Sequence, residues 1–316
     1  MKKILLFLAA ASVVVPGGRV LAAEKGTDNF DYCEYKPTTT AYASVVCQTP
    51  KGPKSISLIT PKIDEQGHVH LGPSEFDAQT LPKARGGDGK SCYLVGRIYI
   101  QVSDTSAAQY WFHRGADAGD LQSMISIGDH NDGGLVIQNG ISTVHRDTHE
   151  AIKWYRMAAE KGSAFAMLKL GLLYTRGRGI ARDPVEAARW FKQGADAGNL
   201  PSMRELAACY AQGIGVKKDM VEAVRLYRLP AEKNDPIAAF ALAEIYEAGI
   251  GAAKDEAEAA RLYRIAAGWG DRKAMLKLSE MYRDGRGVPK DESVAQAWQQ
   301  KSEEKSTITV QSQTVH

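Results

Sequence analysis

The sequence has few cysteines, little excess charge and, beyond its first residues, no long hydrophobic run. The run from Ile4 to Val15 follows Lys2 and Lys3 and is too short to cross a bilayer. Small residues come next, and the whole pattern is typical of a secretory signal peptide. We expect cleavage near Ala22-Ala23, so that residues 1–23 are removed and the mature protein is soluble and exported to the periplasm of a Gram-negative cell.

Neither sign of charge dominates the chain. Its 316 residues carry a formal charge of +3. Lys2, Lys3 and Arg19 lie in the expected signal peptide, so the mature chain is formally neutral. A neutral protein has no general electrostatic attraction to nucleic acid or to anionic lipid. We therefore expect neither nucleic-acid binding nor membrane insertion.

Common motifs of catalysis and metal binding are also missing. The chain has no Gly-x-Ser-x-Gly nucleophile motif and no His-Glu-x-x-His zinc motif. His145 and His149 are four residues apart, but a helix is expected to begin between them, and zinc needs three or four converging ligands. We expect no catalytic residue, no metal and no cofactor.

What the sequence does contain is a period of 36 residues. Four sets of residues keep this spacing: Gly179, Gly215, Gly251 and Gly287; Asp183, Asp219, Asp255 and Asp291; Tyr174, Tyr210, Tyr246 and Tyr282; and Ala187, Ala223, Ala259 and Ala295. Each of these glycines closes a Gly-x-Gly pair. A period in this range predicts a solenoid of stacked helical repeats.

Two earlier units are less regular, which makes six units from about Cys92 to about Lys305. The unit from Leu121 to Ser163 has seven residues more than the period. Its surplus lies around Asp132 to Thr143, where the Gly-x-Gly pair is expected. The unit before it shares the string Gly-Ala-Asp-Ala-Gly, at residues 115–119, with the regular unit at 194–198.

Each unit is predicted to hold two helices, A and then B. Apolar residues at helical spacing predict helix A, and the Gly-x-Gly pair ends it. Asp183 begins helix B as its N-cap, with Glu186 three residues on in the spacing of a capping box. Pro230 is expected to kink or shorten helix B of its unit. The glycine pairs are no phosphate loops, because no Lys-Thr pair follows them.

The repeated string resembles the Sel-1-like repeat family, a branch of the tetratricopeptide-related α-solenoids. The matching string is Leu170-Gly171-x-x-Tyr174-x-x-Gly177-x-Gly179-x-x-x-Asp183-x-x-x-Ala187-x-x-Trp190-Phe191-x-x-x-Ala195-x-x-Gly198. The resemblance implies an all-α, right-handed α-solenoid whose concave face is lined by A helices. It also implies protein binding and no shared catalytic chemistry.

Three segments complete the expected organisation. Residues 24–90 do not repeat, and their prolines and short β-like runs predict an irregular β-containing segment, with a loop from Lys83 to Lys90. Residues 91–305 form the solenoid. The last unit turns polar, as a capping repeat should. Residues 306–316 are rich in Ser, Thr and Gln and predict a disordered tail.

The four cysteines fall into two groups. Cys209 occupies a core position of helix A and is expected to be a buried free thiol. The other three form an odd set in a chain whose export allows disulfides. We predict a disulfide between Cys33 and Cys47, and a bond from Cys92 to either of them is the alternative.

A non-catalytic binding scaffold is therefore the leading function. The specific prediction is an immunity protein that neutralises a periplasm-targeted antibacterial effector, such as a type VI secretion phospholipase, and that is monomeric when free. A periplasmic regulator of an envelope sensor kinase is the second alternative. An enzyme that acts on the cell wall or on β-lactams is the third.

The predicted binding residues lie opposite the apolar side of each helix A, where the repeat pattern does not dictate them. The concave-face set is Arg97, Asp129, Phe165, Lys169, Leu172, Arg176, Arg204, Glu205, Gln212, Ile237, Phe240, Glu244, Lys277, Glu280 and Asp284. Charged side chains around exposed apolar anchors are the usual composition of a binding hot spot.

Overall fold

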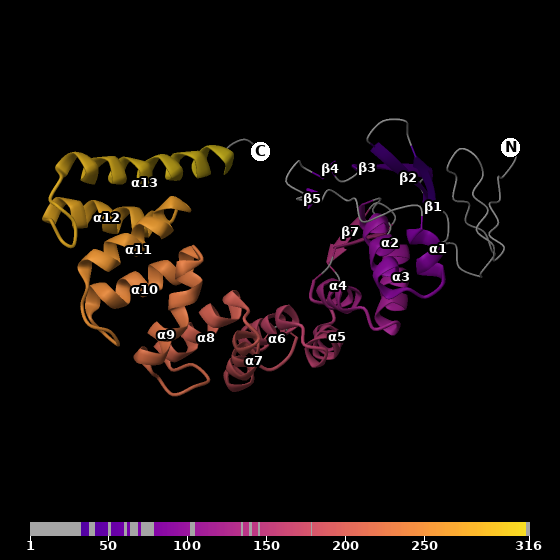
Figure 1. Cartoon of the computed structure of the whole chain (residues 1–316), viewed down its shortest axis with the longest axis horizontal. Helices are drawn as coiled ribbons and strands as arrows, with labels where there is room; N and C mark the ends of the chain where they lie inside the picture. The colour runs from indigo at the N-terminus through magenta and orange to yellow at the C-terminus, as the bar shows by residue number, and fades with distance from the viewer. Residues whose placement is uncertain are drawn as a thin grey trace, which may run out of the picture. The chain divides into compact units, whose positions relative to one another are not determined.

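The computed structural model describes most of the chain beyond the expected signal peptide (Figure 1). The described residues are 33–37, 42–49, 52–59, 62–63, 69–70, 79–101, 105–133, 135–138, 141–144, 146–177 and 179–313. The chain divides into two compact units, residues 1–161 and residues 162–316, which are called unit 1 and unit 2 and are considered separately. No described helix is both long and apolar enough to cross a membrane.

Unit 1 begins with short antiparallel strands. They are β1 (Cys33–Pro37), β2 (Tyr42–Thr49) and β3 (Gly52–Ile59) in one sheet, and β4 (Lys62–Ile63) with β5 (Val69–His70) in another. The register of β1 and β2 sets the backbone of Cys33 directly opposite that of Cys47. Cα atoms of opposed residues in such a pair are about 4.5–5.5 Å apart, within the range that a disulfide spans. Their side chains lie outside the described residues, so the disulfide stays a prediction.

The helices of unit 1 begin earlier than expected. They are α1 (Thr80–Arg85), α2 (Gly89–Gln101), α3 (Thr105–Asp117), α4 (Leu121–Asn131) and α5 (Thr148–Glu160). The predicted loop from Lys83 to Lys90 is therefore wrong, because α1 runs to Arg85 and α2 begins at Gly89. The Asp88 carboxylate accepts the Ser91 backbone N–H at 2.9 Å, so it starts α2 sooner than the glycine-rich sequence indicated.

The longer A–B connection of unit 1 contains a β-hairpin in place of the glycine pair. Its strands are β6 (Leu135–Gln138) and β7 (Ile141–Val144), between α4 and α5. The base of the insertion is closed by the Asp147 N–H, which donates to the Asn131 carbonyl at 2.8 Å. The same closure joins Asp183 to Tyr174 in unit 2, at 3.1 Å. The insertion therefore leaves the connection from helix A to helix B intact.

Unit 2 contains four A–B helix pairs that stack in chain order (Figure 1). The A helices are α6 (Ala164–Arg176), α8 (Leu200–Gln212), α10 (Pro236–Ala248) and α12 (Arg272–Asp284). The B helices are α7 (Pro184–Asp196), α9 (Met220–Glu232), α11 (Glu256–Gly268) and α13 (Glu292–Gln313). This arrangement confirms the all-α solenoid.

The start of each B helix explains the repeated aspartate and tyrosine. Asp219 accepts the N–H groups of Val221 and Glu222, both at 3.0 Å, and its own N–H donates to the Tyr210 carbonyl at 3.0 Å. Since that N–H is already taken, the capping-box glutamate bonds elsewhere. Glu222 pairs with Arg225 at 2.6 Å. The aspartate caps are thus confirmed, while the predicted return bond of the glutamate is replaced by an ion pair.

The two glycines of each pair have different tasks. Gly213 adopts φ 73° and ends α8 in the left-handed conformation. Gly215 also has a positive φ, and a Cβ there would lie 1.9 Å from the Pro184 carbonyl oxygen. Gly251 and Gly287 approach Met220 and Glu256 in the same way, so the second glycine lets these three A–B loops contact the start of the preceding B helix. Only a residue without a side chain fits that approach.

The core of unit 2 follows the alanine and aromatic spacing. Ala223 and Ala259 are fully buried, and so is Tyr263. Gly171 lies against the ring of Phe191, which supplies bulk between helices A and B. A Cβ added at Gly171 would overlap that ring, so the glycine and the aromatic residue fit each other.

Two features of the B helices differ from expectation. Helix α9 keeps the 13-residue length of α7 although Pro230 lies inside it, so the predicted shortening is wrong. Pro230 falls in the last turn, where the missing N–H costs a single helical bond. Helix α13 runs through Gln313, into the segment from residue 306 for which the sequence predicted disorder. No glycine or proline follows Glu292 to end it.

Candidate protein-binding face

One side of each A helix in unit 2 is not fully buried in the core. The four positions that share it follow the helical spacing i, i+4, i+7 and i+11. On the four A helices these positions hold Phe165, Lys169, Leu172 and Arg176; Pro201, Glu205, Ala208 and Gln212; Ile237, Ala241, Glu244 and Ala248; and Lys273, Lys277, Glu280 and Asp284. None of the sixteen is buried. We call this set the A-face.

Contacts between successive A helices make the A-face continuous. Helix α6 contacts α8 directly. Arg204 on α8 pairs with Asp235, the N-cap of α10, at 2.8 Å. Lys277 on α12 pairs with Glu247 on α10 at 3.0 Å. The four helices therefore lie side by side through unit 2, and their exposed positions form one surface.

The exposed apolar residues of the A-face gather at the N-terminal ends of its helices. Phe165 is 43% exposed and Ile237 is 59% exposed. Pro201 occupies the equivalent position on α8 and is half-buried. The Lys169 ammonium lies 5.1 Å from the centroid of the Phe165 ring, a cation–π contact within the face. These residues supply apolar area that the core of unit 2 does not use.

Two predicted site residues face the neighbouring repeat rather than the A-face. Arg204 and Phe240 both occupy the helical position at which Leu168 is buried. Arg204 is tied to Asp235, as above, and also to Glu205 at 2.9 Å. Phe240 is half-buried and meets the Tyr263 ring edge-on, with centroids 5.5 Å apart. We therefore assign both to contacts between repeats, and their role as binding residues stays a prediction.

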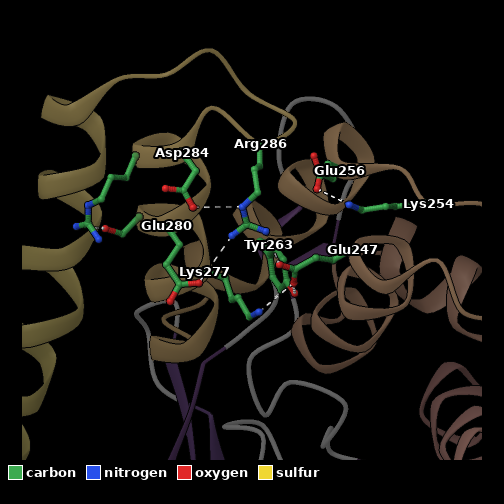
Figure 2. Close-up of polar contacts among 10 residues, drawn as sticks. Glu247, Lys254, Glu256, Tyr263, Lys277, Glu280, Asp284 and Arg286 are labelled. Carbon is green, nitrogen blue, oxygen red and sulfur yellow. Dashed lines mark hydrogen bonds and ion pairs between the residues drawn. The ribbon is translucent and has the colours of Figure 1, made fainter.

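A half-buried carboxylate that the sequence analysis missed organises the end of the A-face. Glu247 on α10 accepts hydrogen bonds from the Tyr263 hydroxyl at 2.7 Å, the Lys277 ammonium at 3.0 Å and the Arg286 guanidinium at 2.9 Å (Figure 2). The Glu247 side chain is 16% exposed. The three donors come from α11, from α12 and from the loop after α12, so one carboxylate joins the last two repeats.

The electrostatics of Glu247 follow from this geometry. Burial by itself raises the pKa of the Glu247 carboxyl, and the hydrogen bonds from Tyr263, Arg286 and Lys277 outweigh burial, so its pKa lies below the ordinary value. Burial also raises the pKa of Tyr263, and the bond to the Glu247 carboxylate raises it further. The network is therefore ionised as a carboxylate with two cations and a neutral phenol at neutral pH.

Arg286 extends the network to the A-face. Its guanidinium lies 3.4 Å from the Asp284 carboxylate and 3.9 Å from that of Glu280 (Figure 2). Arg286 stands between the glycines of the last Gly-x-Gly pair, where two of the other units carry isoleucine. Gly177-Arg178-Gly179 carries arginine at the same position, so the repeat pattern gave no signal for Arg286. It gave none for Glu247 either, since the equivalent positions of the other repeats hold Thr175, Ala211 and Arg283.

The two remaining predicted residues belong to unit 1. Arg97 is exposed on α2 and lies over the Tyr93 ring, 5.8 Å from its centroid. Asp129 on α4 accepts a hydrogen bond from the Tyr155 hydroxyl at 2.6 Å. They are therefore described apart from the A-face, which is a feature of unit 2.

One segment of unit 1 has the spacing of a phosphate loop without its geometry. Gly89-Lys90-Ser91 follows Ala84 at the interval that a P-loop requires. A P-loop presents free backbone N–H groups to phosphate. Here the Asp88 carboxylate takes the Ser91 N–H, and those hydrogen bonds hold the pKa of Asp88 below its ordinary value. A helix, α1, precedes the segment where a P-loop has a strand. The segment is a helix cap.

Cys92 and Cys209, whose side chains are described, are both free thiols. Cys92 is a fully buried free thiol whose Sγ donates to the Ala84 carbonyl, so its alternative pairing with Cys33 or Cys47 is wrong. Cys209 is also free and is half-buried. Burial raises the pKa of each thiol to about 11. Among the described residues, no three His, Cys, Asp or Glu side chains are grouped as metal ligands.

The repeats can now be compared with known proteins. A model of the Sel1 repeat matches residues 86–120, 130–163, 164–199, 200–235, 236–268 and 272–306, about two thirds of the chain. The chain belongs to the Sel1-repeat family. The matched segments confirm the six predicted units. Sel1-repeat proteins are protein-binding scaffolds and are generally non-catalytic.

Solved structures and a curated relative agree with this assignment. A protective antigen of uropathogenic Escherichia coli with this fold is 29% identical, with a TM-score of 0.66 over 75% of this chain and 49% of its own. A Sel1 repeat protein of Oxalobacter formigenes is also 29% identical, with a TM-score of 0.58 over 71% of this chain and 90% of its own.

The curated relative is a sel1-like repeat-containing protein of Acanthamoeba polyphaga mimivirus. It is 39% identical over 62 residues, which are 20% of this chain. The chain thus spans only 11% of the viral protein, and about half of the Escherichia coli antigen. These matches bear on the repeats and carry no information on a particular partner.

Proposed function

We propose that this Sel1-repeat protein is an exported, non-catalytic scaffold that binds another protein through the A-face. The observation that carries the proposal is that none of the sixteen A-face positions is fully buried and that Phe165 and Ile237 among them are exposed. A face that served only solubility would have no use for large apolar side chains next to charges. Apolar anchors within a polar surround are typical of protein interfaces.

The more specific proposal is an immunity protein of the periplasm, which neutralises an antibacterial effector such as a secreted phospholipase. Export is supported by the signal-peptide pattern of residues 1–23. The backbone register that sets Cys33 opposite Cys47 supports it too, since disulfides persist in oxidising compartments. N-terminal sequencing of the exported protein should find a start near Ala23 or Glu24 without lipid. An intact Met1 in the envelope fraction contradicts export.

The binding test is capture of a partner from periplasmic extract, followed by variants of the A-face. Ile237→Asp should reduce capture at least about tenfold, because it sets a charge in the apolar part of the face. Val221→Asp is the matched control, since Val221 is 68% exposed at the second residue of a B helix, the position that Ile237 has in an A helix. Equal loss for both variants, or none for either, excludes the A-face as the binding site.

The immunity test uses the captured protein directly. A bacterial strain that exports the captured effector to its own periplasm should survive when it also makes wild-type scaffold, and should die with the Ile237→Asp variant. If the captured protein is not toxic in the periplasm, the immunity role is wrong. Capture of an envelope sensor kinase instead supports the regulatory role. A hydrolysis assay on lipid or cell-wall substrate checks for catalysis.

A further inference from the structure

The charges of the A-face are segregated along unit 2. Its first helix, α6, carries Lys169 and Arg176 and has no acidic residue. Helix α10 is the reverse, with Glu244 and Glu247 and no basic residue. Arg176 and Glu244 are both exposed, and neither makes a hydrogen bond or ion pair with any described residue. Helices α6 and α10, the first and the third of the face, thus present opposite charges to solvent.

The Glu247 network keeps the far end acidic. Helix α12 adds Lys277, Glu280 and Asp284 to the A-face, together with Lys273 at its apolar edge. The half-buried carboxylate of Glu247 pairs with the Lys277 ammonium at 3.0 Å and with the Arg286 guanidinium at 2.9 Å, so one negative charge is shared between two positive ones. The carboxylates of Glu280 and Asp284 are about half exposed, 53% and 56%. With Glu244 and Glu247 counted, four carboxylates stand against Lys273, Lys277 and Arg286, so this part of the face carries one excess negative charge.

The apolar residues of the A-face lie along one edge of it, near the N-terminal ends of the helices. Phe165, Pro201 and Ile237 occupy the same position on three successive A helices, so they form a row across the direction of the helices. Packed helices are about 9 Å apart, so four A helices span about 27 Å. An extended chain covers that length with about eight residues, and a helix with about eighteen.

We infer that the A-face binds an elongated polypeptide segment whose charges are segregated. The segment has acidic side chains over α6, basic side chains over α10 and α12, and apolar side chains along Phe165, Pro201 and Ile237. The inference rests on the proposed function and adds the chemistry and the orientation of the partner. Complementary charge at both ends fixes the direction in which the segment lies, because the reversed direction sets like charges against each other.

A selection from random peptides tests this inference with defined probes. A library of peptides about eighteen residues long is displayed and enriched on the immobilised mature protein. The expected result is a set of peptides with acidic residues at one end, basic residues at the other and apolar residues between. Peptides without this segregation, or no enrichment over an empty support, overturn the inference.

Charge reversals then locate the two ends. Lys169→Glu with Arg176→Glu should weaken a selected peptide about tenfold, and so should Glu244→Lys with Glu280→Lys. The matched controls on B helices are Arg189→Glu with Lys192→Glu, and Asp196→Lys with Glu232→Lys, which should leave affinity unchanged. Truncating the acidic end of the peptide should remove the effect of the α6 pair alone. Circular dichroism of each variant checks the fold.

The outcomes separate this inference from the proposed function. If Ile237→Asp abolishes peptide binding while both charge pairs leave it unchanged, the A-face binds protein but the charge assignment is wrong. If Ile237→Asp and both charge pairs all leave binding unchanged, the peptides bind elsewhere and the inference is overturned. Capture of the natural partner remains the separate test of the proposed function.

Discussion

The connection from helix A to helix B differs between the two units, and the comparison shows which part of the repeat is essential. In unit 2 a Gly-x-Gly loop makes the connection, as at Gly213 and Gly215, and in unit 1 a β-hairpin does so between α4 and α5. Both keep the aspartate cap and its N–H bond to the end of helix A, at 3.0 Å for Asp219 and 2.8 Å for Asp147. The aspartate cap is therefore the feature that both connections share. The Gly-x-Gly loop serves a narrower purpose, which is contact with the preceding repeat.

The largest expected effect comes from the second glycine of a loop in unit 2. Gly215→Ala should cost about 3 kcal/mol of stability, because a left-handed conformation and an overlap with the Pro184 carbonyl coincide. Gly198→Ala is the control, since Gly198 has φ 83° but nothing within 4 Å of its added Cβ. It should cost about 1 kcal/mol. Equal urea midpoints for the two variants would show that the close approach is unimportant.

The next effect tests whether the small core position matters equally in both units. Ala223→Leu in unit 2 and Ala151→Leu in unit 1 should each cost about 2 kcal/mol, because both alanines are fully buried. Val221→Ala should change stability by less than about 0.5 kcal/mol, since Val221 is 68% exposed. Thermal unfolding of the three variants gives the order. If Ala223→Leu is as stable as wild type, the 36-residue repeats have been aligned wrongly with one another.

The Glu247 network is specific to unit 2 and should show in the pH dependence. Glu247→Gln should cost about 1.5 kcal/mol at pH 7, because two cations lose their carboxylate. The pKa of Glu247 is lowered from its ordinary 4.5 in the folded state. Its stabilisation is therefore complete above pH 4.5 and is lost as the pH falls through the lowered pKa. The difference between wild type and variant should shrink in that acidic range. A constant difference would exclude the ionised network.

The smallest effect compares the caps themselves. Asp219→Ala should cost about 1 kcal/mol, and Asp147→Ala somewhat less. The reason is that Asp219 accepts two backbone N–H groups, whereas the cap bond of Asp147 joins the Glu150 N–H alone among the described residues. Asn variants at both positions should recover most of the loss. If Asp147→Ala has no effect, the cap is dispensable where the hairpin supports the connection.

Much of the candidate site was predictable because exposure on a regular helix follows from spacing. Once Leu170 and Leu173 define the core side of α6, the A-face position of Arg176 follows by geometry. The contacts of Arg204 and Phe240 with the neighbouring repeat could not be predicted, because only the stacking of the helices shows which residues meet there. Glu247 was missed because a single glutamate carries no pattern of its own.

By itself the sequence determined the number of repeats and the aspartate and glycine positions that start and end the helices of the regular repeats, because each depends on residues a few positions apart along the chain. The tertiary structure decided what happens between repeats. It brings Glu247 to Arg286 across 39 residues, and Gly215 to Pro184 across 31. It also folds the surplus of unit 1 into a hairpin. These outcomes depend on which surfaces meet when the repeats stack. The spacing of residues along the chain does not show which surfaces those are.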